Sequence, residues 1–439
     1  MRSTCNWPGV DTIRQDSDFW KVNYAGAVII AACIVGGGTA QGLWTDHLLE
    51  ILMIPAIIFG YSSLWNNRLG HGANLLAAGT VVFLFLQFFP WSPQQNLPAL
   101  PLGLKTLAFW TLSPSRSLES AVFAASVLGF ALFVATMRGH LQTRLVRFVF
   151  LGLMINIAVG IIQLSYSGRT NIEGVLPYEI TSALFANENH FSALVFATIP
   201  LLAWRFLAEE RQTVYYLLIV IAVVGVLFAV GSRAGMGISA GLAVLSLVWF
   251  ALASRFATAR ILLLALGVAG LLMVYLGGGF GLALESELRP VFFRNTWMAI
   301  RDHWITGTGL GTFVIVYPQY EPLRDVIAVY ANHAHNDYLE LLLEGGVPAL
   351  LLVILYVALI ARNALNSKLS EAATLSILAI LLHSLVDYPL RTMAIAIIFA
   401  LLSTIVLSQP DETAQQAFKG RAGPSKMPRN TSSESRDVM

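Results

Sequence analysis

The chain has 439 residues, of which 56% are hydrophobic and only 12% are charged. Soluble domains carry roughly 25% charged residues, so this composition excludes a single soluble core and indicates that lipid is the solvent. The net charge of +2 excludes the strongly basic surface typical of nucleic-acid binding, and no nucleic-acid partner is expected.

Apolar segments recur along almost the whole chain. Because a helix needs about 20 mostly apolar residues to span a bilayer, the sequence predicts an all-α, polytopic integral membrane protein with about twelve transmembrane helices. Residues 1–23 are polar, lack the pattern of a cleaved signal peptide and are expected to form a cytoplasmic N-terminal segment. The transmembrane domain is expected over residues 24–408, and its predicted spans are 25–43, 48–65, 72–89, 120–137, 148–165, 191–207, 213–230, 234–253, 261–280, 346–361, 372–387 and 392–408.

The distribution of basic residues predicts the orientation, because lysine and arginine favour the cytoplasmic side of a membrane. With both termini in the cytoplasm, about two thirds of the 27 lysine and arginine residues fall on that side. This orientation leaves two long loops outside, residues 90–118 and a large periplasmic loop over 281–345 that is expected to contain short helices. The polar tail 409–439 is expected to be cytoplasmic and disordered.

The first chemical motif is Gly231-Ser-Arg233-Ala-Gly235, which lies between two apolar runs. Charges at membrane depth are costly and often functional, and arginine offers a fixed fork of donors to phosphate oxygens. The alternative is structural, since the two glycines have the spacing used for close helix packing and the arginine can extend to lipid headgroups. The motif alone leaves both interpretations open.

The large loop carries the second motif. Arg294-x-x-Trp297 and Arg301 lie within a segment, Val291 to Thr306, that is expected to form a short amphipathic helix at the membrane surface. The two arginines lie seven residues apart and would share a helix face. Glycines then recur as GxGxG from Gly307, without the strand and helix of a nucleotide site, so a tight turn is expected.

The densest polar cluster is Asn-His333-Ala-His335-Asn-Asp-Tyr-Leu-Glu, over residues 332–340. The spacing of His335, Leu339 and Leu342 predicts that the cluster opens a helix. A histidine here has a pKa near neutrality and can accept a proton from a hydroxyl group. The alternatives are a pair of surface histidines that cap the helix, or a metal site, for which no further ligand follows at a familiar spacing.

Weaker signals lie on both sides of these motifs. Arg169 stands in the loop 166–189, which ends in Asn187-Glu-Asn-His190. His383, Asp387 and Arg391 lie four residues apart and could stack on one helix face until Pro389 interrupts it. An ion pair between Asp387 and Arg391 is the structural interpretation of that spacing.

These motifs, in this order, resemble the O-antigen ligase and O-antigen polymerase superfamily of bacterial envelope glycan assembly. The resemblance covers roughly residues 180–405, whereas residues 1–150 match only in being membrane spans. It implies a GT-C-like integral membrane glycosyltransferase of the bacterial inner membrane, with its active site facing the periplasm. Such an enzyme takes a glycan from undecaprenyl diphosphate and attaches it to lipid A core, to a growing glycan chain or to protein. It needs neither metal nor nucleotide, so no cofactor is expected.

The resemblance also assigns roles to individual residues. His335 matches the family's loop histidine and would act as the general base, while Arg233 and Arg294 match its arginines and would stabilise the diphosphate. Further candidates for substrate binding are Arg301, His333, Arg391 and Arg169. The implied partners are the lipid-linked donor, the lipid A core or glycan acceptor, membrane lipids, and a polysaccharide chain-length regulator.

Two other functions compete with glycan transfer. Twelve spans are also common among transporters, so a flippase or transporter for a lipid-linked or anionic substrate is the main alternative. Transporters often place ionisable residues near the membrane midplane and show two related halves, whereas here the charges concentrate in outer loops and no repeat is visible. A non-catalytic scaffold would use the large loop as a docking surface. The sequence does not separate ligase from polymerase.

Overall fold

The computed structural model describes residues 9–89, 110–165, 175–230, 233–252, 288–326 and 331–409. In this part of the chain every named element is a helix, so the predicted all-helical class is confirmed. Four helices are long and apolar enough to cross a membrane, Pro114–Ala135, Gly139–Gln163, Glu188–Glu209 and Asp337–Asn363, and several apolar helices are shorter. The protein is thus a multi-pass membrane protein by its apolar helices.

The helices follow one another closely. The first half contains α1 (Gly9–Val35), α2 (Trp44–Leu52), α3 (Ile54–Ser62), α4 (His71–Leu86), α5 (Pro114–Ala135) and α6 (Gly139–Ser165). The second half contains α7 (Glu188–Ala203), the π-helices η1 (Trp204–Glu209) and η2 (Val248–Leu252), α8 (Thr213–Val230), α9 (Arg233–Leu247), α11 (Arg289–His303), α12 (Phe313–Val316), α13 (Asp337–Asn363), α14 (Lys368–His383) and α15 (Met393–Leu407). Short 3-10 helices are η5 (Tyr317–Gln319), η6 (Leu323–Asp325) and η7 (Pro389–Arg391).

Two helices form the centre of the bundle. Every residue of α15 from Met393 to Leu407 is buried except Phe399, and α7 is buried from His190 to Ala203. A helix that is apolar on all sides is stable only when other helices surround it. Helices α5, α14 and α1 pack around α15, while α14 and α9 pack against α7. Both central helices therefore hold their neighbouring loops in fixed positions at the ends of the bundle.

The predicted spans coincide with helices apart from the segment 261–280, which lies outside the described residues, and two expected boundaries are wrong. The span 25–43 ends early, because α1 stops at Val35 and three glycines follow. A Cβ on Gly37 would lie 2.4 Å from the carbonyl oxygen of Leu184, so this backbone crossing requires glycine. The span 48–65 is divided at Met53, because Pro55 cannot occupy a helix interior and lies in the first turn of α3 instead.

The glycine-rich segment after α11 forms the tight turn that the sequence predicts. Gly307, Gly309 and Gly311 have φ angles of 74°, 102° and 74°, values that favour glycine. The turn packs against α13 where that helix is interrupted by Gly346, with φ of 58°. A Cβ on Gly346 would lie 2.6 Å from the backbone nitrogen of Gly307. The turn and the interruption therefore fit together through backbone contacts.

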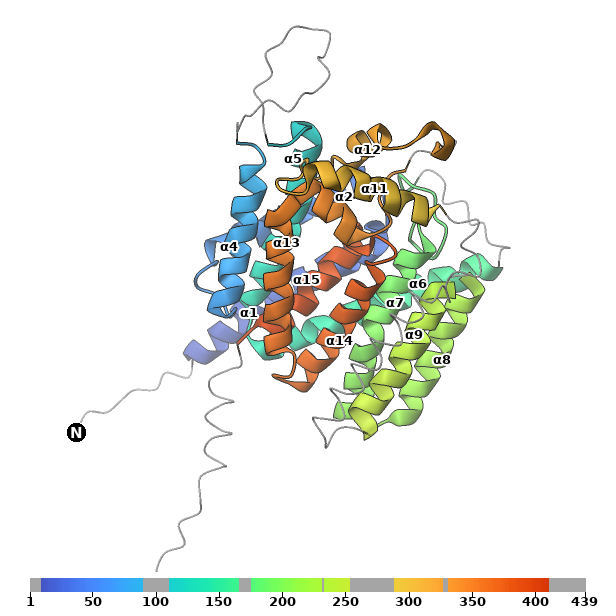
Figure 1. The fold of residues 1–439 in the computed structure, drawn as a ribbon. Coiled ribbons are helices and arrows are strands. Elements are labelled where there is room, and N and C mark those ends of the chain that lie inside the picture. Colours follow the sequence, from blue (N-terminus) through green and yellow to red (C-terminus); the bar gives the residue numbers. More distant parts are fainter. Residues whose placement is uncertain are drawn as a thin grey trace, which may run out of the picture.

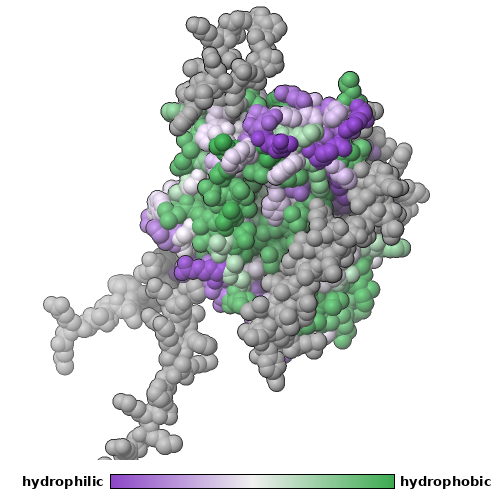
Figure 2. All heavy atoms as spheres, viewed as in Figure 1, coloured by the Kyte–Doolittle hydropathy of each residue, from purple (hydrophilic) through white to green (hydrophobic). Residues whose placement is uncertain are grey.

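The predicted helix over 291–306 is confirmed as α11, which lies across one end of the bundle, transverse to α13 (Figure 1). On the face shown in Figure 2, hydrophilic side chains gather at this end, and a broad hydrophobic region lies below them. An apolar belt beside a polar end is the arrangement expected of a bundle in lipid. We call this the polar end.

Candidate active site

Three segments that are distant in sequence meet at the polar end. Helix α13 begins there, immediately after the His333–His335 motif, and Asn336 caps it by accepting hydrogen bonds of 3.0 Å from the backbone N–H groups of Tyr338 and Leu339. Helix α7 also begins there, as is shown by the contact of Asn189, in its first turn, with Asp387 in the loop between α14 and α15. The cap confirms that the polar motif opens a helix, and it fixes where the preceding histidines lie.

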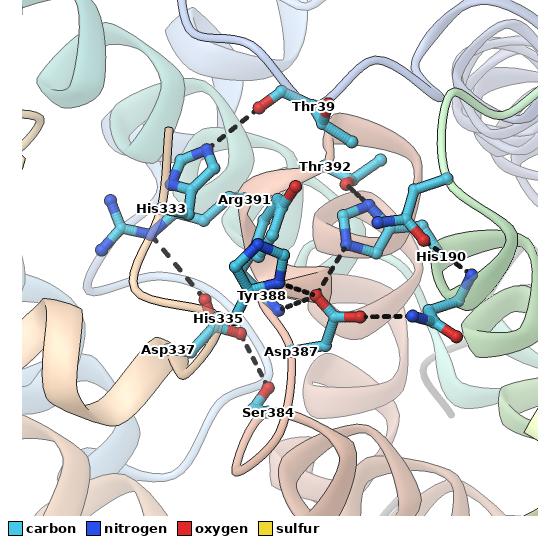
Figure 3. A network of polar contacts seen from close by, with 12 residues as sticks. Thr39, His190, His333, His335, Asp337, Ser384, Asp387, Tyr388, Arg391 and Thr392 are labelled. Carbon is cyan, nitrogen blue, oxygen red and sulfur yellow. Dashed lines mark hydrogen bonds and ion pairs between the residues drawn. The ribbon is translucent and has the colours of Figure 1, made fainter. Parts of the chain in front are cut away.

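Asp387 is the centre of the first polar cluster. Its carboxylate is fully buried and accepts hydrogen bonds from the Asn189 side chain at 2.8 Å and from the Tyr388 backbone N–H at 3.0 Å. Two imidazoles face its Oδ1 atom: Nδ1 of His335 at 3.5 Å and Nε2 of His190 at 3.8 Å (Figure 3). A single carboxylate thus gathers donors from three separate segments.

Electrostatics keep Asp387 ionised. Burial alone would raise the pKa of this carboxyl group, but the facing imidazoles of His190 and His335 outweigh burial and hold its pKa well below the ordinary value. Arg289, the first residue of α11, adds a guanidinium nitrogen 3.8 Å from Oδ2. Asp387 is therefore a fixed negative charge that can stabilise a positive charge on a neighbouring imidazole.

His335 occupies an unusual position beside this carboxylate. Its φ angle of 52° is in the left-handed region, which is strained for a residue other than glycine. The ring stacks on Phe292 of α11, with centroids 5.6 Å apart, and meets the edge of Tyr388 at 4.9 Å. Its side chain is 22% exposed. Because Nδ1 faces Asp387, Nε2 is the nitrogen left to accept a proton, as in other bases oriented by a carboxylate.

Arg391 is the centre of the second cluster, which carries the opposite charge pattern. Its guanidinium lies 3.0 Å from Glu344, 3.4 Å from Glu340 and 3.8 Å from Asp337. These carboxylates occupy one face of the first two turns of α13. The side chain of Arg391 is only 21% exposed, and its charge is already balanced by these three groups.

His333 belongs to this second cluster and not to the first. Its Nδ1 lies 2.8 Å from Glu340, and its Nε2 donates to the carbonyl oxygen of Thr39 at 3.0 Å. Burial would lower the pKa of His333, but the Glu340 carboxylate outweighs it and the pKa is raised. Both nitrogens are engaged, so His333 is not available as a base, whereas His335 is. The ring of Tyr388 lies between them, 4.2 Å from that of His333 (Figure 3).

Residues 217–354 match the family model described as O-Antigen ligase. This part of the chain is thus similar to the O-antigen ligase family. The match contains Arg233, Arg289, Arg294 and both histidines of the motif, while Asp387 and Arg391 lie beyond it. A search of the curated proteins finds no match.

Two expected placements at the polar end are wrong. His335 is not on the helix with Leu339 and Leu342, because the cap residue Asn336 separates it from α13. His383, Asp387 and Arg391 do not stack on one helix, because α14 ends at His383, a turn holds Asp387, and Arg391 lies in η7. The expected ion pair between Asp387 and Arg391 is replaced by partners on other segments.

The remaining candidate arginines lie around the polar end or outside the described residues. Arg294 and Arg301 share the exposed face of α11, as their spacing predicts, and Arg294 forms an ion pair with Asp325. Arg233 begins α9; since α7, α8 and α9 alternate in direction, it begins at the end where α7 begins (Figure 1). The side chain of Arg233, and Arg169 altogether, lie outside the described residues.

Sequence reasoning missed two contributors to the first cluster, Arg289 and Tyr388, and treated His190 and Asp387 only as weak signals. A carboxylate in a short connection between two apolar segments was the available signal, because such a charge is costly unless it is paired. Nothing in the local pattern identifies its partners, since Asn189 and Asp387 are 198 residues apart.

Proposed function

We propose that this protein is an enzyme of the O-antigen ligase family, which transfers a glycan from undecaprenyl diphosphate to an acceptor hydroxyl at the periplasmic face of the membrane, with His335 as the general base. The observation that carries the proposal is the contact between His335 and the buried, ionised Asp387. A base whose orientation is fixed by a third group is the usual way to activate a hydroxyl nucleophile. The acceptor is lipid A core in a ligase and a growing polysaccharide in a polymerase.

The reaction divides into two balanced changes. The acceptor hydroxyl gives its proton to Nε2 of His335, and its oxygen bonds to the anomeric carbon of the donor sugar. The bond between that carbon and the diphosphate oxygen breaks, and the diphosphate leaves with the electron pair. Asp387 stabilises the imidazolium that forms, and arginines stabilise the leaving anion.

The exposed face of α11 supports a role in binding the lipid diphosphate. Arg294 and Arg301 lie on this face together with Trp297 and Trp304, which are 53% and 51% exposed. Indole rings favour the level of the lipid headgroups, and the planar guanidinium group matches phosphate geometry. A helix that lies across the end of the bundle can thus present arginines at the depth where a lipid diphosphate lies. Arg233 would approach the same headgroup from the start of α9.

The direction of the helices supports a periplasmic site. Helices α7 and α13 begin at the polar end, so their other ends carry Arg205, Arg211, Arg362 and Lys368 at the opposite face. Basic residues favour the cytoplasmic side. The transporter alternative would instead place ionisable groups near the midplane, whereas both polar clusters gather at the polar end.

Substitution of His335 tests the proposal directly. Purified His335→Ala protein, supplied with lipid-linked glycan and acceptor, should lose about 10²–10⁴-fold in transfer rate, the usual contribution of a general base. The matched control is His140→Ala, an exposed histidine near the start of α6, which should keep full activity. Undiminished transfer by the His335→Ala protein would refute the assignment.

A further inference from the structure

We propose that a cavity beside the active site binds uncharged, hydroxyl-rich sugar units of the glycan, which gives the protein a saccharide subsite separate from the diphosphate site. This inference rests on the glycan transfer proposed above and adds where the sugars lie. The cavity has a volume of about 600 Å³ and lies between the loop after α1, helices α2 and α5, the glycine-rich turn and the start of α13. Its volume is within the range of small-molecule sites.

The cavity shares a wall with the active site. His333 and Arg391 line it, whereas His335 does not. The ring of Tyr388 contacts the rings of both His333 and His335, so a single aromatic ring connects a residue of the cavity wall with the proposed base. A glycan whose reacting sugar lies at His335 could therefore place adjoining sugar units in the cavity.

The charges that line the cavity do not suit a diphosphate. Arg391 is balanced by Glu340 and Glu344, and His47 lies 2.9 Å from Glu50. Arg116 also lines the cavity, so the lining holds two arginines against five carboxylates, those of Asp46, Glu50, Glu119, Glu340 and Glu344. A group of two phosphates would bring further negative charge to a wall that already carries carboxylates, which electrostatic complementarity disfavours. The diphosphate therefore has better partners among the arginines of α11 than in this cavity.

The same lining suits sugar hydroxyl groups. Asp46 lines the cavity, is only 8% exposed, and its Oδ1 atom has no hydrogen-bond partner among the described residues. An unpaired buried acceptor is costly unless a ligand donates to it. Glu119 lines the cavity beside the loop after α1, where a Cβ on Gly42 would lie 3.3 Å from its Oε2 atom. Phe123 and Phe313 add aromatic surface for the apolar faces of sugar rings.

The test measures binding and does not depend on catalysis. Two lipid-free probes are titrated into purified His335→Ala protein by calorimetry: the core oligosaccharide released by mild acid from the source bacterium's lipopolysaccharide, and the oligosaccharide of its repeat unit. The double change Asp46→Asn and Glu119→Gln should weaken binding of at least one probe by tenfold or more. Loss confined to the core probe assigns the cavity to the acceptor, and loss confined to the repeat probe assigns it to the donor.

Two further variants keep the result interpretable. Ala40→Trp, at an exposed lining position, should block the cavity without disturbing the core, and should weaken binding similarly. Glu209→Gln, an exposed carboxylate at the other end of α7 and η1, should change nothing. Inorganic pyrophosphate should bind every variant equally.

Three results would overturn the cavity assignment: saccharide affinity unchanged in both cavity variants, no saturable binding of either probe, or a loss of pyrophosphate affinity in place of saccharide affinity. The outcome is distinguishable from failure of the proposed function. If wild-type protein transfers no glycan but the cavity variants lose saccharide affinity, only the reaction assignment falls. If His335→Ala abolishes transfer and saccharide affinity is unchanged in the cavity variants, only the cavity assignment falls.

Discussion

The two polar clusters at the polar end share Tyr388 and lie side by side, but their charge patterns are opposite. In the first cluster, imidazoles and a guanidinium surround the carboxylate of Asp387, and the ring of His335 is partly exposed. In the second cluster, three carboxylates surround the guanidinium of Arg391, and both ring nitrogens of the nearby His333 form hydrogen bonds. The difference shows how a membrane protein uses buried charge in two ways: the first cluster leaves a proton acceptor available, and the second holds α13 to the loop before α15.

The largest effect is expected from Asp387→Asn. The amide keeps the shape of the side chain but removes the negative charge that stabilises the imidazolium of His335, so the transfer rate should fall by about 10²–10⁴-fold. Because the pKa of Asp387 is held well below its ordinary value, the carboxylate is charged throughout the assay range and only the variant loses it. An unchanged rate would show that the two clusters do not differ in function.

Arg391→Gln should act on stability and not on the chemical step. Removal of the guanidinium leaves three neighbouring carboxylates without compensation, and breaking a buried ion pair typically costs about 3–5 kcal/mol. Thermal unfolding in detergent should show a large fall in midpoint, whereas the control Arg362→Gln, at an exposed position near the end of α13, should not. A stable variant with impaired transfer would instead favour the substrate-binding role that the sequence predicts for Arg391.

The pH dependence of stability should reveal the state of His333. Its pKa is raised in the folded protein, so protonation stabilises the fold fully below the ordinary pKa of about 6.5, and this contribution is lost as pH rises through the raised value. The unfolding midpoint of the wild type should fall between pH 6 and pH 9 by on the order of 2–4 °C for each kcal/mol lost. His333→Gln should flatten this dependence. The same slope in both proteins would contradict the assignment.

The smallest effect on stability is expected from Arg301→Gln. The side chain is exposed on α11, and surface substitutions usually change stability by less than about 0.5 kcal/mol. Transfer should nevertheless weaken through a higher KM for the lipid-linked donor, because the proposed role of Arg301 is to bind its diphosphate. Raised salt should reproduce part of this change in the wild type. A donor KM equal to that of the wild type would remove Arg301 from the site.

Much of the fold follows from local pattern. Apolar segments and their lengths predict most helices, because hydrophobic burial and backbone hydrogen bonding are satisfied within a segment. The glycine-rich turn and the helix that opens after residue 336 were likewise predictable from nearby residues. The predicted end of the first span is wrong because another segment intervenes: the backbone near Leu184 crosses the glycines at 36–38, and α1 ends before them. The sequence also did not predict the interruption of α13 at Gly346, where the turn at Gly307 packs.

The sequence by itself determined that lipid surrounds the protein, that the fold is helical, and which residue types are candidates for the chemistry, His335 and the arginines of α11 among them. Only the tertiary structure decided which charges face each other. Asp387 takes its partners from α7, α11 and the segment before α13, and Arg391 takes its partners from α13, although the spacing in sequence suggested that these two residues would pair. The physical reason is that ion pairing depends on distance through space, and a buried charge is matched by whichever opposite charge the packing of distant helices brings within a few ångströms.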